Sequence, residues 1–251
     1  MKGVDGMITR RNNGMFVATL SIVALILAAC TSAGDDNTQA SGFGQTSTSV
    51  PTPDPYKLAM GDPLAPGRYA FDADPDDSPG SYAFDTDHDS YWITMDIPGG
   101  WGGNEGSVIT KGTPGKAIST WAVSNVYADP CAWEGTLLDP LAGLSVDGLV
   151  ATLAAQKDRH ASKPTDVTLD GFSGTYMEVT TPAGIDLANC DEGQFRSWDG
   201  RWTDPGQRDM LWIVDVDGVL LVIDAALDAG TSARDRAENT KIAESTQIDP
   251  V

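Results

Sequence analysis

A two-residue turn between two apolar segments constrains the fold more than any other feature. Segments 210–216 and 219–225 flank Asp217-Gly218, and Asp-Gly between such segments predicts a β-hairpin with a type I′ turn. In this register Leu211 faces Asp224. Successive side chains of a strand point to opposite faces, and both faces of this hairpin are mainly apolar. Both faces must therefore be covered by other parts of the chain.

Further strands follow from alternation and turn signals. Period-two alternation over 91–97 predicts one strand. Asp170-Gly171 predicts a second hairpin between 166–169 and 172–180. Shorter strands are expected over 68–73, 81–85 and 118–124.

Two helices are expected. Ser145–Lys157 carries an apolar stripe on one side. Ser232–Glu244 opens with a capping-box pattern in which Asp235 occupies the usual Glu position. Together with the hairpins, these helices predict an α+β fold: an antiparallel sheet covered by helices, in a single domain.

Composition excludes some classes of protein. The chain has 36 acidic and 16 basic residues, a net charge of −20, so we expect no nucleic-acid partner, because phosphate binding needs clustered Lys and Arg. Hydrophobic residues make up 41% of the chain and include seven Trp, which is enough for a packed core. Asp (30) far outnumbers Glu (6), and this bias favours turns and caps over helix interiors.

The N-terminus has the pattern of an export signal. Lys2, Arg10 and Arg11 precede an apolar run over 15–29, which is shorter than the roughly 20 residues of a membrane-spanning helix. Leu-Ala-Ala stands immediately before Cys30 and resembles the bacterial lipobox, in which the Cys receives a diacylglycerol. The sequence therefore predicts a lipoprotein signal peptide over 1–29 and palmitate-type lipidation of Cys30. An uncleaved signal anchor is the alternative.

The predicted domain organisation follows from the signal. Residues 30–55 are rich in Ser, Thr, Gly and Pro and predict a flexible tether; residues 56–251 would form the extracytoplasmic domain. Cleavage would leave 13 basic and 35 acidic residues, a net charge of −22. Because anionic lipids repel such a chain, we expect the lipid on Cys30, not charge, to hold it at the cell membrane.

Three segments resemble a known group. These are Tyr127–Pro140 (YADPCAWEGTLLDP), Asn189–Gly193 (NCDEG) and Gly206–Gly218 (GQRDMLWIVDVDG). They are similar to recurring segments of uncharacterised actinobacterial lipoproteins and membrane-anchored extracellular domains, over about residues 120–248. The resemblance implies no catalytic residue. The order of elements is also similar to the Mog1/PsbP-like α/β/α sandwich.

Cysteine usage predicts a disulfide. With Cys30 lipidated, Cys131 and Cys190 are the two remaining thiols, and an even pair in an exported chain favours a bridge. A free nucleophile or a metal ligand is the alternative.

Catalytic motifs are missing, so we do not expect an enzyme, and we expect no cofactor. The chain has no Gly-x-Ser-x-Gly, Ser-x-x-Lys or His-Glu-x-x-His. The Gly-rich segment 99–106 is interpreted as a wide turn. Asp215 and Asp224 share a hairpin face at about 13 Å, beyond the ~5–9.5 Å of glycosidase carboxylates. We expect these acids to be solvated or to cap turns at the sheet edge.

An acidic segment offers a weak calcium candidate. Asp85, Asp87 and Asp89 could supply oxygen ligands. Ser90 stands where an EF-hand has Gly, and a strand follows instead of a helix, so an EF-hand is rejected. A solvated charged turn is the alternative to a looser site.

The candidate ligand-binding segment is 195–208, interpreted as a loop. It gathers two Trp and three Arg in an acidic chain, which suits stacking and bidentate hydrogen bonding to a sugar or an anion. The candidate residues are Arg196, Trp198, Arg201, Trp202 and Arg208. In the alternative, the Trp rings fold inward and the Arg side chains pair with local Asp.

These features support a hypothesis for function. It is a membrane-anchored lipoprotein whose domain binds or interacts with a partner at the cell envelope, such as a wall polysaccharide or an envelope protein. The main alternative is a cell-wall-associated hydrolase with an unrecognised carboxylate site. A purely structural envelope component is a third possibility.

Overall fold

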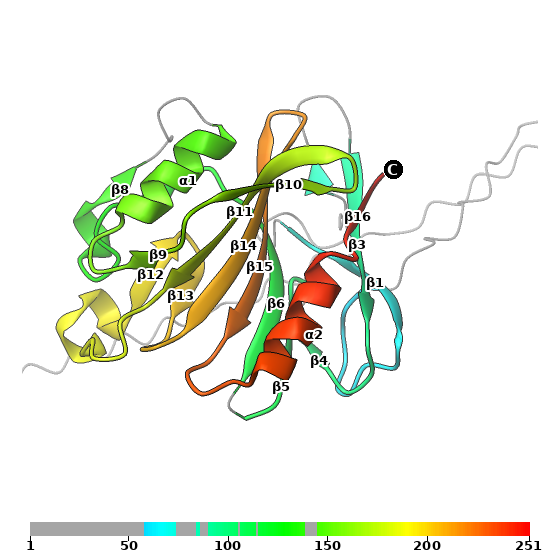
Figure 1. The fold of residues 1–251 in the computed structure, drawn as a ribbon, viewed down its shortest axis with the longest axis horizontal. Helices are drawn as coiled ribbons and strands as arrows, with labels where there is room; N and C mark the ends of the chain where they lie inside the picture. The colour runs from blue at the N-terminus through cyan, green and yellow to red at the C-terminus, as the bar shows by residue number, and fades with distance from the viewer. Residues whose placement is uncertain (1–57, 74–83, 86–89, 105, 114, 139–144) are drawn as a thin grey trace, which may run out of the picture. The chain divides into compact units, whose positions relative to one another are not determined.

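A computed structural model describes residues 58–73, 84–85, 90–104, 106–113, 115–138 and 145–251. The predicted signal peptide, the tether and Cys30 lie outside these residues, as do Asp87 and Asp89. The described residues form antiparallel sheets and two α-helices (Figure 1), which confirms the α+β class. None of the helices among the described residues has the length and apolar character needed to cross a membrane.

The main sheet has eight strands in the order β10-β11-β14-β15-β6-β5-β4, with β9 paired to β11. Every pair in it is antiparallel. Its strands are β4 (Gly102–Asn104), β5 (Val108–Lys111), β6 (Lys116–Ala122), β9 (His160–Ala161), β10 (Thr165–Leu169), β11 (Phe172–Thr180), β14 (Arg208–Val216) and β15 (Val219–Leu227).

The predicted register of the central hairpin is confirmed. Leu211 pairs with Asp224 across β14 and β15. Asp217 and Gly218 both have positive φ, 48° and 91°, as a type I′ turn requires. The second predicted hairpin, β10–β11, is also confirmed, with its turn at Asp170-Gly171.

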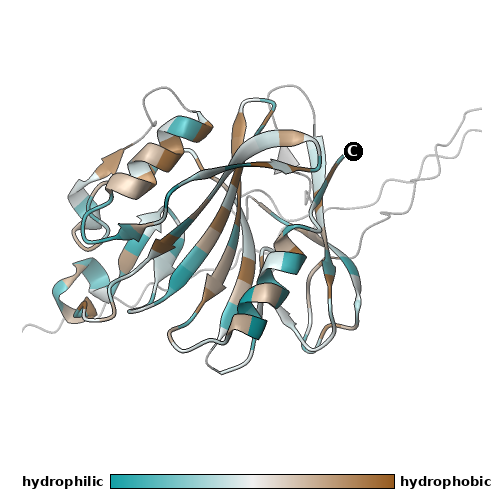
Figure 2. Ribbon diagram, in the orientation of Figure 1, coloured by the Kyte–Doolittle hydropathy of each residue, from teal (hydrophilic) through white to brown (hydrophobic). Residues whose placement is uncertain are grey.

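One face of the main sheet packs against a second sheet and helix α2 (Ala233–Ala243). The second sheet consists of β1 (Gly67–Phe71), β2 (Phe84–Asp85), β3 (Ser90–Ile97) and β16 (Gln247–Pro250). Apolar residues on these elements form one buried cluster with the sheet, and Figure 2 shows the brown bands along the central strands. The predicted capping box between Ser232 and Asp235 is confirmed at the start of α2.

Helix α1 (Val146–Ala155) covers the opposite face. Its Leu149 and Leu153 are fully buried in a cluster with Leu211, Ile213 and Val222 of the central strands. Ser145 caps the helix through a hydrogen bond from the amide of Gly148. The remaining short elements beside it are β7 (Val126–Tyr127), β8 (Leu137–Leu138), β12 (Phe195–Trp198), β13 (Arg201–Thr203) and the 3₁₀ helices Trp133–Gly135, Leu187–Asn189 and Asp191–Gly193.

The interpretation of the Gly-rich segment 99–106 as a turn is wrong in part, because it contains strand β4. Backbone hydrogen bonds join Gly103 to Gly61, 2.7 and 3.2 Å long. A Cβ on Gly103 would lie 2.0 Å from the carbonyl oxygen of Ala59. Gly103 therefore permits a close backbone approach.

The predicted Cys131–Cys190 disulfide is present. It joins the segment before the first 3₁₀ helix to the segment that leads into β12. Two backbone hydrogen bonds run beside it, from Asp191 to the carbonyl of Cys131 and from Arg196 to the carbonyl of Pro130, both 2.8 Å. The bridge thus fixes one end of the β12–β13 hairpin.

Replacing both bridge cysteines by Ser should lower the free energy of unfolding by about 4 kcal/mol, because the bridge closes a long loop in the unfolded chain. The two residues are 59 positions apart. Denaturant unfolding of the double variant, beside the parent with and without reductant, measures the effect. Equal midpoints for the variant and the oxidised parent would contradict the expectation.

Candidate functional site

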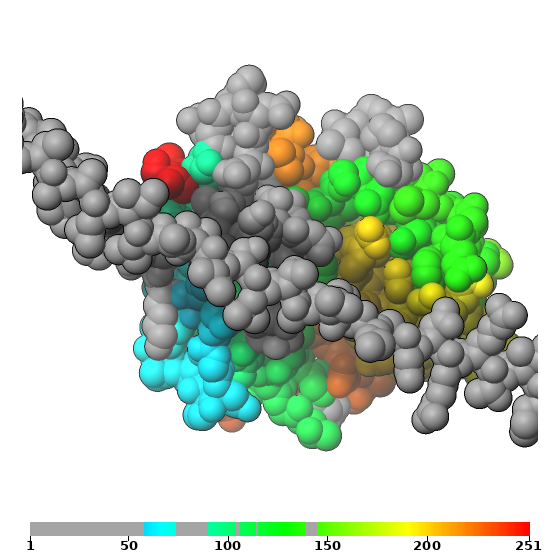
Figure 3. Space-filling model, turned by 180° about the vertical axis from the view of Figure 1, so that it is seen from behind, coloured from blue at the N-terminus to red at the C-terminus, as the bar shows by residue number. Residues whose placement is uncertain are grey.

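Residues 195–203 form a hairpin, β12–β13, so the interpretation of segment 195–208 as a loop is wrong in part; residues 204–207 form a turn that leads into β14. Asp199-Gly200 makes the turn, and Gly200 has a φ of 73°. A Cβ on Gly200 would also approach the ring of Trp121 to 3.3 Å, so this position favours Gly for two reasons. The hairpin lies beside α1 on the same side of the main sheet, as the yellow and green atoms in Figure 3 show.

Strand alternation decides which side chains of β13 face inward. Arg201 and Thr203 point to the sheet, whereas Trp202 points outward and is 56% exposed. Trp198 of β12 is buried at 3% exposure and meets Trp121 edge to face, with ring centroids 6.1 Å apart. Of the two candidate Trp residues, only Trp202 can reach a ligand.

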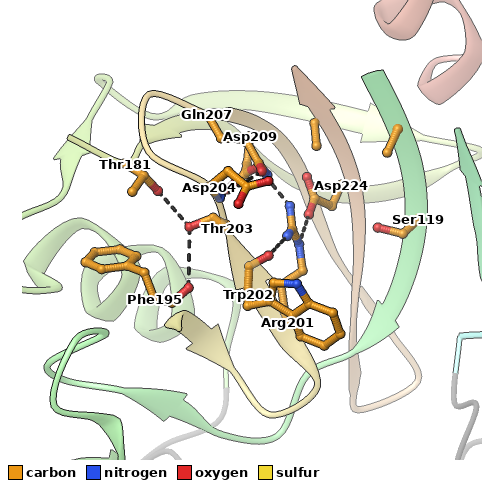
Figure 4. A network of polar contacts seen from close by, with 12 residues as sticks. Ser119, Thr181, Phe195, Arg201, Trp202, Thr203, Asp204, Gln207, Asp209 and Asp224 are labelled. Carbon is orange, nitrogen blue, oxygen red and sulfur yellow. Dashed lines mark hydrogen bonds and ion pairs between the residues drawn. The ribbon is translucent and has the colours of Figure 1, made fainter. Parts of the chain in front are cut away.

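Arg201 bridges two buried carboxylates (Figure 4). Its Nε donates to Asp224 Oδ2 at 2.6 Å, and its Nη2 donates to Asp209 Oδ1 at 2.9 Å. The side chains of Asp224 and Asp209 are 0% and 2% exposed. Two such charges in the sheet would be very unfavourable without a paired cation, so Arg201 holds the hairpin against β14 and β15.

A second arginine extends this network. Arg159 is fully buried, lies over the ring of Phe195 and approaches Asp209 Oδ2 to 3.4 Å. It also donates to Gln156 Oε1 at 3.2 Å. The Gln156 amide in turn donates to the backbone carbonyls of Tyr127 and Ser197, at 2.9 and 2.7 Å. The network thus connects the C-terminal end of α1 to the hairpin.

The network shifts the pKa values of its members. Burial raises the pKa of Asp224 to about 6; Arg201 opposes this shift and the charge of Asp209 adds to it. Burial lowers the pKa of Arg159 to about 10. For Arg201, burial also favours the neutral form, but the charges of Asp224 and Asp209 outweigh it and raise the pKa.

The expectation that Asp224 is solvated or caps a turn at the sheet edge is wrong, because β15 is a central strand. For Asp215 a capping role holds: it accepts a hydrogen bond from the amide of Gly218 at 2.7 Å. Sequence reasoning missed Asp209. The register that pairs Leu211 with Asp224 already places Asp209, two residues earlier, on the same face, and that signal could have revealed the pair.

The other two candidate arginines also have partners. Arg196 stacks over the ring of Trp133, 3.8 Å from its centroid, and its Nε donates to Gln194 Oε1 at 2.8 Å. Arg208 lies 3.8 Å from Glu178 and its side chain is 49% exposed. The arginines of this segment therefore do not converge on one open site.

A cleft of about 560 Å³ opens beside the hairpin, on the same face of the sheet as Asp224. Thr110, Ala117 and Ser119 of β5 and β6 form part of its lining, and Arg201 and Trp202 line it from β13. Its volume lies in the usual range of small-ligand sites. Within the described part of the chain, no three acidic, His or Cys side chains are grouped so that they could hold a metal ion.

Comparison with known proteins identifies no family. No protein-family model and no curated protein sequence matches the chain. Weak similarity exists to solved structures, of which three are described. A Bacteroides thetaiotaomicron protein has a TM-score of 0.30 and 12% identity, over 62% of this chain and 44% of its own. Cyanobacterial PsbP (CyanoP) from Synechocystis sp. PCC 6803 has a TM-score of 0.35 and 14% identity, over 74% and 94%.

The third structure is LpqN of Mycobacterium tuberculosis, described as involved in cell envelope biogenesis, with a TM-score of 0.28 and 12% identity over 79% of this chain and 87% of its own. The chain spans less than half of the Bacteroides protein. These low scores transfer no activity and no site to this chain. The resemblance to actinobacterial lipoproteins remains a prediction.

The raised pKa of Asp224 predicts a pH dependence of stability. The native state binds this proton at about pH 6 and the unfolded chain at about pH 3.9. The contribution of Asp224 to stability is therefore greatest at pH values below its pKa in the unfolded chain. It is lost as the pH rises through its pKa in the native state. Relative to Asp224→Asn, the parent should gain up to about 3 kcal/mol on going from neutral to acidic pH. Denaturant unfolding of both proteins across this range measures the gain.

Arg201→Met sharpens this test. Arg201 opposes the upward shift of the Asp224 pKa. Its loss should therefore move the pH range over which the protein loses this stability to higher pH. At neutral pH it should also destabilise the protein by about 3–5 kcal/mol, since two buried carboxylates lose their main cation. A stability difference between parent and Asp224→Asn that does not change with pH would contradict the assignment.

Proposed function

We propose that this chain is a lipid-anchored extracytoplasmic protein that uses the cleft beside Trp202 to bind a carbohydrate of the cell envelope. The export signal and the lipobox-like sequence before Cys30 support the location. The observation that carries the binding role is the exposed Trp202, which lines a cleft together with both polar and apolar residues. An indole is a preferred surface for stacking against a ligand ring.

The hairpin also gives the cleft a fixed wall. Arg201 and the disulfide hold β13 in place, so little conformational freedom is lost when a ligand binds. The hydroxyl-bearing residues Thr110 of β5 and Ser119 of β6 line the same cleft. Such a surface offers hydrogen bonds to the hydroxyl groups of a sugar.

Two finer assignments belong to the same proposal. We assign the domain, residues 56–251, to the α/β/α sandwiches of the Mog1/PsbP kind, and the chain to the actinobacterial lipoprotein group that its sequence resembles. Support for the sandwich comes from α1 and α2, which pack on opposite faces of the main sheet. The second sheet shares the face of α2.

The hydrolase alternative receives no specific support from the described residues. Asp209 and Asp224 are two buried carboxylates that share one cation. Arg201 binds both, and neither lines the cleft. We therefore propose binding as the function of this site.

Trp202→Ala should weaken binding to purified wall polysaccharide by about tenfold or more, because it removes the stacking surface. Its effect on the free energy of unfolding should stay within about 0.5 kcal/mol, since the side chain is exposed. Co-sedimentation with insoluble wall material measures binding, and thermal melting measures stability.

Two variants control this experiment. Trp202→Phe keeps an aromatic face and should retain most of the binding. Leu138→Ala removes another exposed apolar side chain, 42% exposed on β8, away from the cleft. A folded Trp202→Ala protein that binds as well as the parent would reject the site.

Cys30→Ala should leave the chain unprocessed or released from the membrane, because the thiol of Cys30 is the group that receives the lipid. Metabolic labelling with a palmitate analogue tests this. Ser32→Ala, two residues further along, should label like the parent. Label on the Cys30→Ala protein would refute the anchor.

A further inference from the structure

The charged side chains that line the cleft differ in whether they form ion pairs within the protein. Three are cations, Lys111, Lys116 and Arg201. Both lysine ammonium groups lie within 6 Å of the ring of Trp101, which belongs to the core on the far face of the sheet. There Glu238 pairs with each of them, at 3.0 and 2.8 Å.

The guanidinium of Arg201 also binds groups inside the protein. Asp224 and Asp209 bind its Nε and Nη2, and the backbone carbonyl of Trp202 accepts from its Nη1. All three nitrogens of the guanidinium thus have partners inside the protein. Each cation among the described residues that line the cleft is already paired with a carboxylate inside the protein, which argues against an anion site here.

The carboxylates that line the cleft, unlike the cations, lack ion-pair partners among the described residues. Asp62, Asp204 and Asp228 form no ion pair with the described residues. Asp228 accepts one hydrogen bond, from the amide of Gly115 at 2.7 Å. Asp204 lies near enough to Arg201 for its negative charge to favour the charged form of the Arg201 guanidinium.

A further carboxylate lies under the floor of the cleft. Asp224 pairs across the strands with Ser119, which lines the cleft. One of its oxygens, Oδ1, is buried without a hydrogen-bond partner. Arg159 and Arg201 together match the charges of Asp209 and Asp224, so the carboxylates that line the cleft set its net charge.

Trp202 completes the recognition surface. Its indole lines the cleft and is 56% exposed. The face of an indole attracts cations as well as the C–H faces of sugars. An aromatic face beside carboxylates is the usual arrangement for binding an ammonium group.

We infer that the ligand of this cleft carries a positive charge: a saccharide with a free, unacetylated amino group, its ring on Trp202 and its ammonium toward Asp62 and Asp204. This inference rests on the proposed function and names the ligand class of the same site. It reverses the charge that the three arginines of segment 195–208 predict from the sequence.

A matched pair of probes tests the charge. The full chain, purified in detergent, is titrated with a glucosamine tetramer and with its fully N-acetylated counterpart, and tryptophan fluorescence reports binding. At about pH 6 the amines of the first probe are charged, because such groups titrate near the range of an α-amino group, about pH 8. We expect the glucosamine tetramer to bind about tenfold more tightly at low salt, with an advantage that shrinks as salt is added.

Three variants locate the interaction. Asp62→Asn and Asp204→Asn should each reduce the advantage of the glucosamine tetramer severalfold, because each removes one charge from the cleft. Asp166→Asn, an exposed acid on β10 outside the cleft, removes the same charge at a distance and should leave the advantage unchanged. Thermal melts confirm that each variant is folded.

The outcomes separate this inference from the proposed function. If the N-acetylated tetramer binds as tightly or more tightly and Trp202→Ala abolishes this binding, the inferred positive charge of the ligand is wrong. The proposed carbohydrate site then still stands. A glucosamine preference that Asp166→Asn weakens as much as Asp204→Asn would overturn the assignment to the cleft, because it would reflect net charge alone. Binding of neither tetramer would overturn both.

Discussion

The contact of Arg201 with Asp209 and Asp224 is the constraint on which the candidate site depends. Two carboxylates within a central part of the main sheet are compatible with folding only if cations reach them. Arg159 supplies one, and Arg201 supplies the other from a separate hairpin. The position of β12–β13 is therefore set by charge as much as by the packing of Trp198.

The same contact determines what the hairpin presents to solvent. On a strand, neighbouring side chains point to opposite sides. With Arg201 and Thr203 held inward, Trp202 must face outward, and its exposure follows from this geometry. The ion pair that fixes the wall of the cleft thereby also creates its aromatic surface. Because the pair uses the guanidinium completely, the wall contributes little free positive charge.

Local signals in the sequence were sufficient for most of the architecture. Asp-Gly turns and apolar alternation predicted the register of β14–β15, and Ser232 with Asp235 predicted the start of α2. Asp199-Gly200 is a signal of the same kind, but its flanking residues lack regular alternation, so the sequence there favours a loop. The cleft could not be predicted, since the hairpin of β13 meets strands β5 and β6 of the main sheet only in the folded protein.

The charge of the candidate segment shows why counting residues fails at a site. Arg196, Arg201 and Arg208 make segment 195–208 look basic in an acidic chain. Folding brings each of them to a carboxylate from outside β13, namely Glu192, Asp224 and Glu178. A ligand meets the charge that is left after such pairing. Among the described residues of the cleft that Trp202 lines, this charge includes the exposed carboxylates of Asp62 and Asp204. Because the field of an ion pair falls off faster with distance than that of a single charge, unpaired groups dominate the potential in the cleft, and their sign is opposite to that of the arginines in the segment that forms its wall.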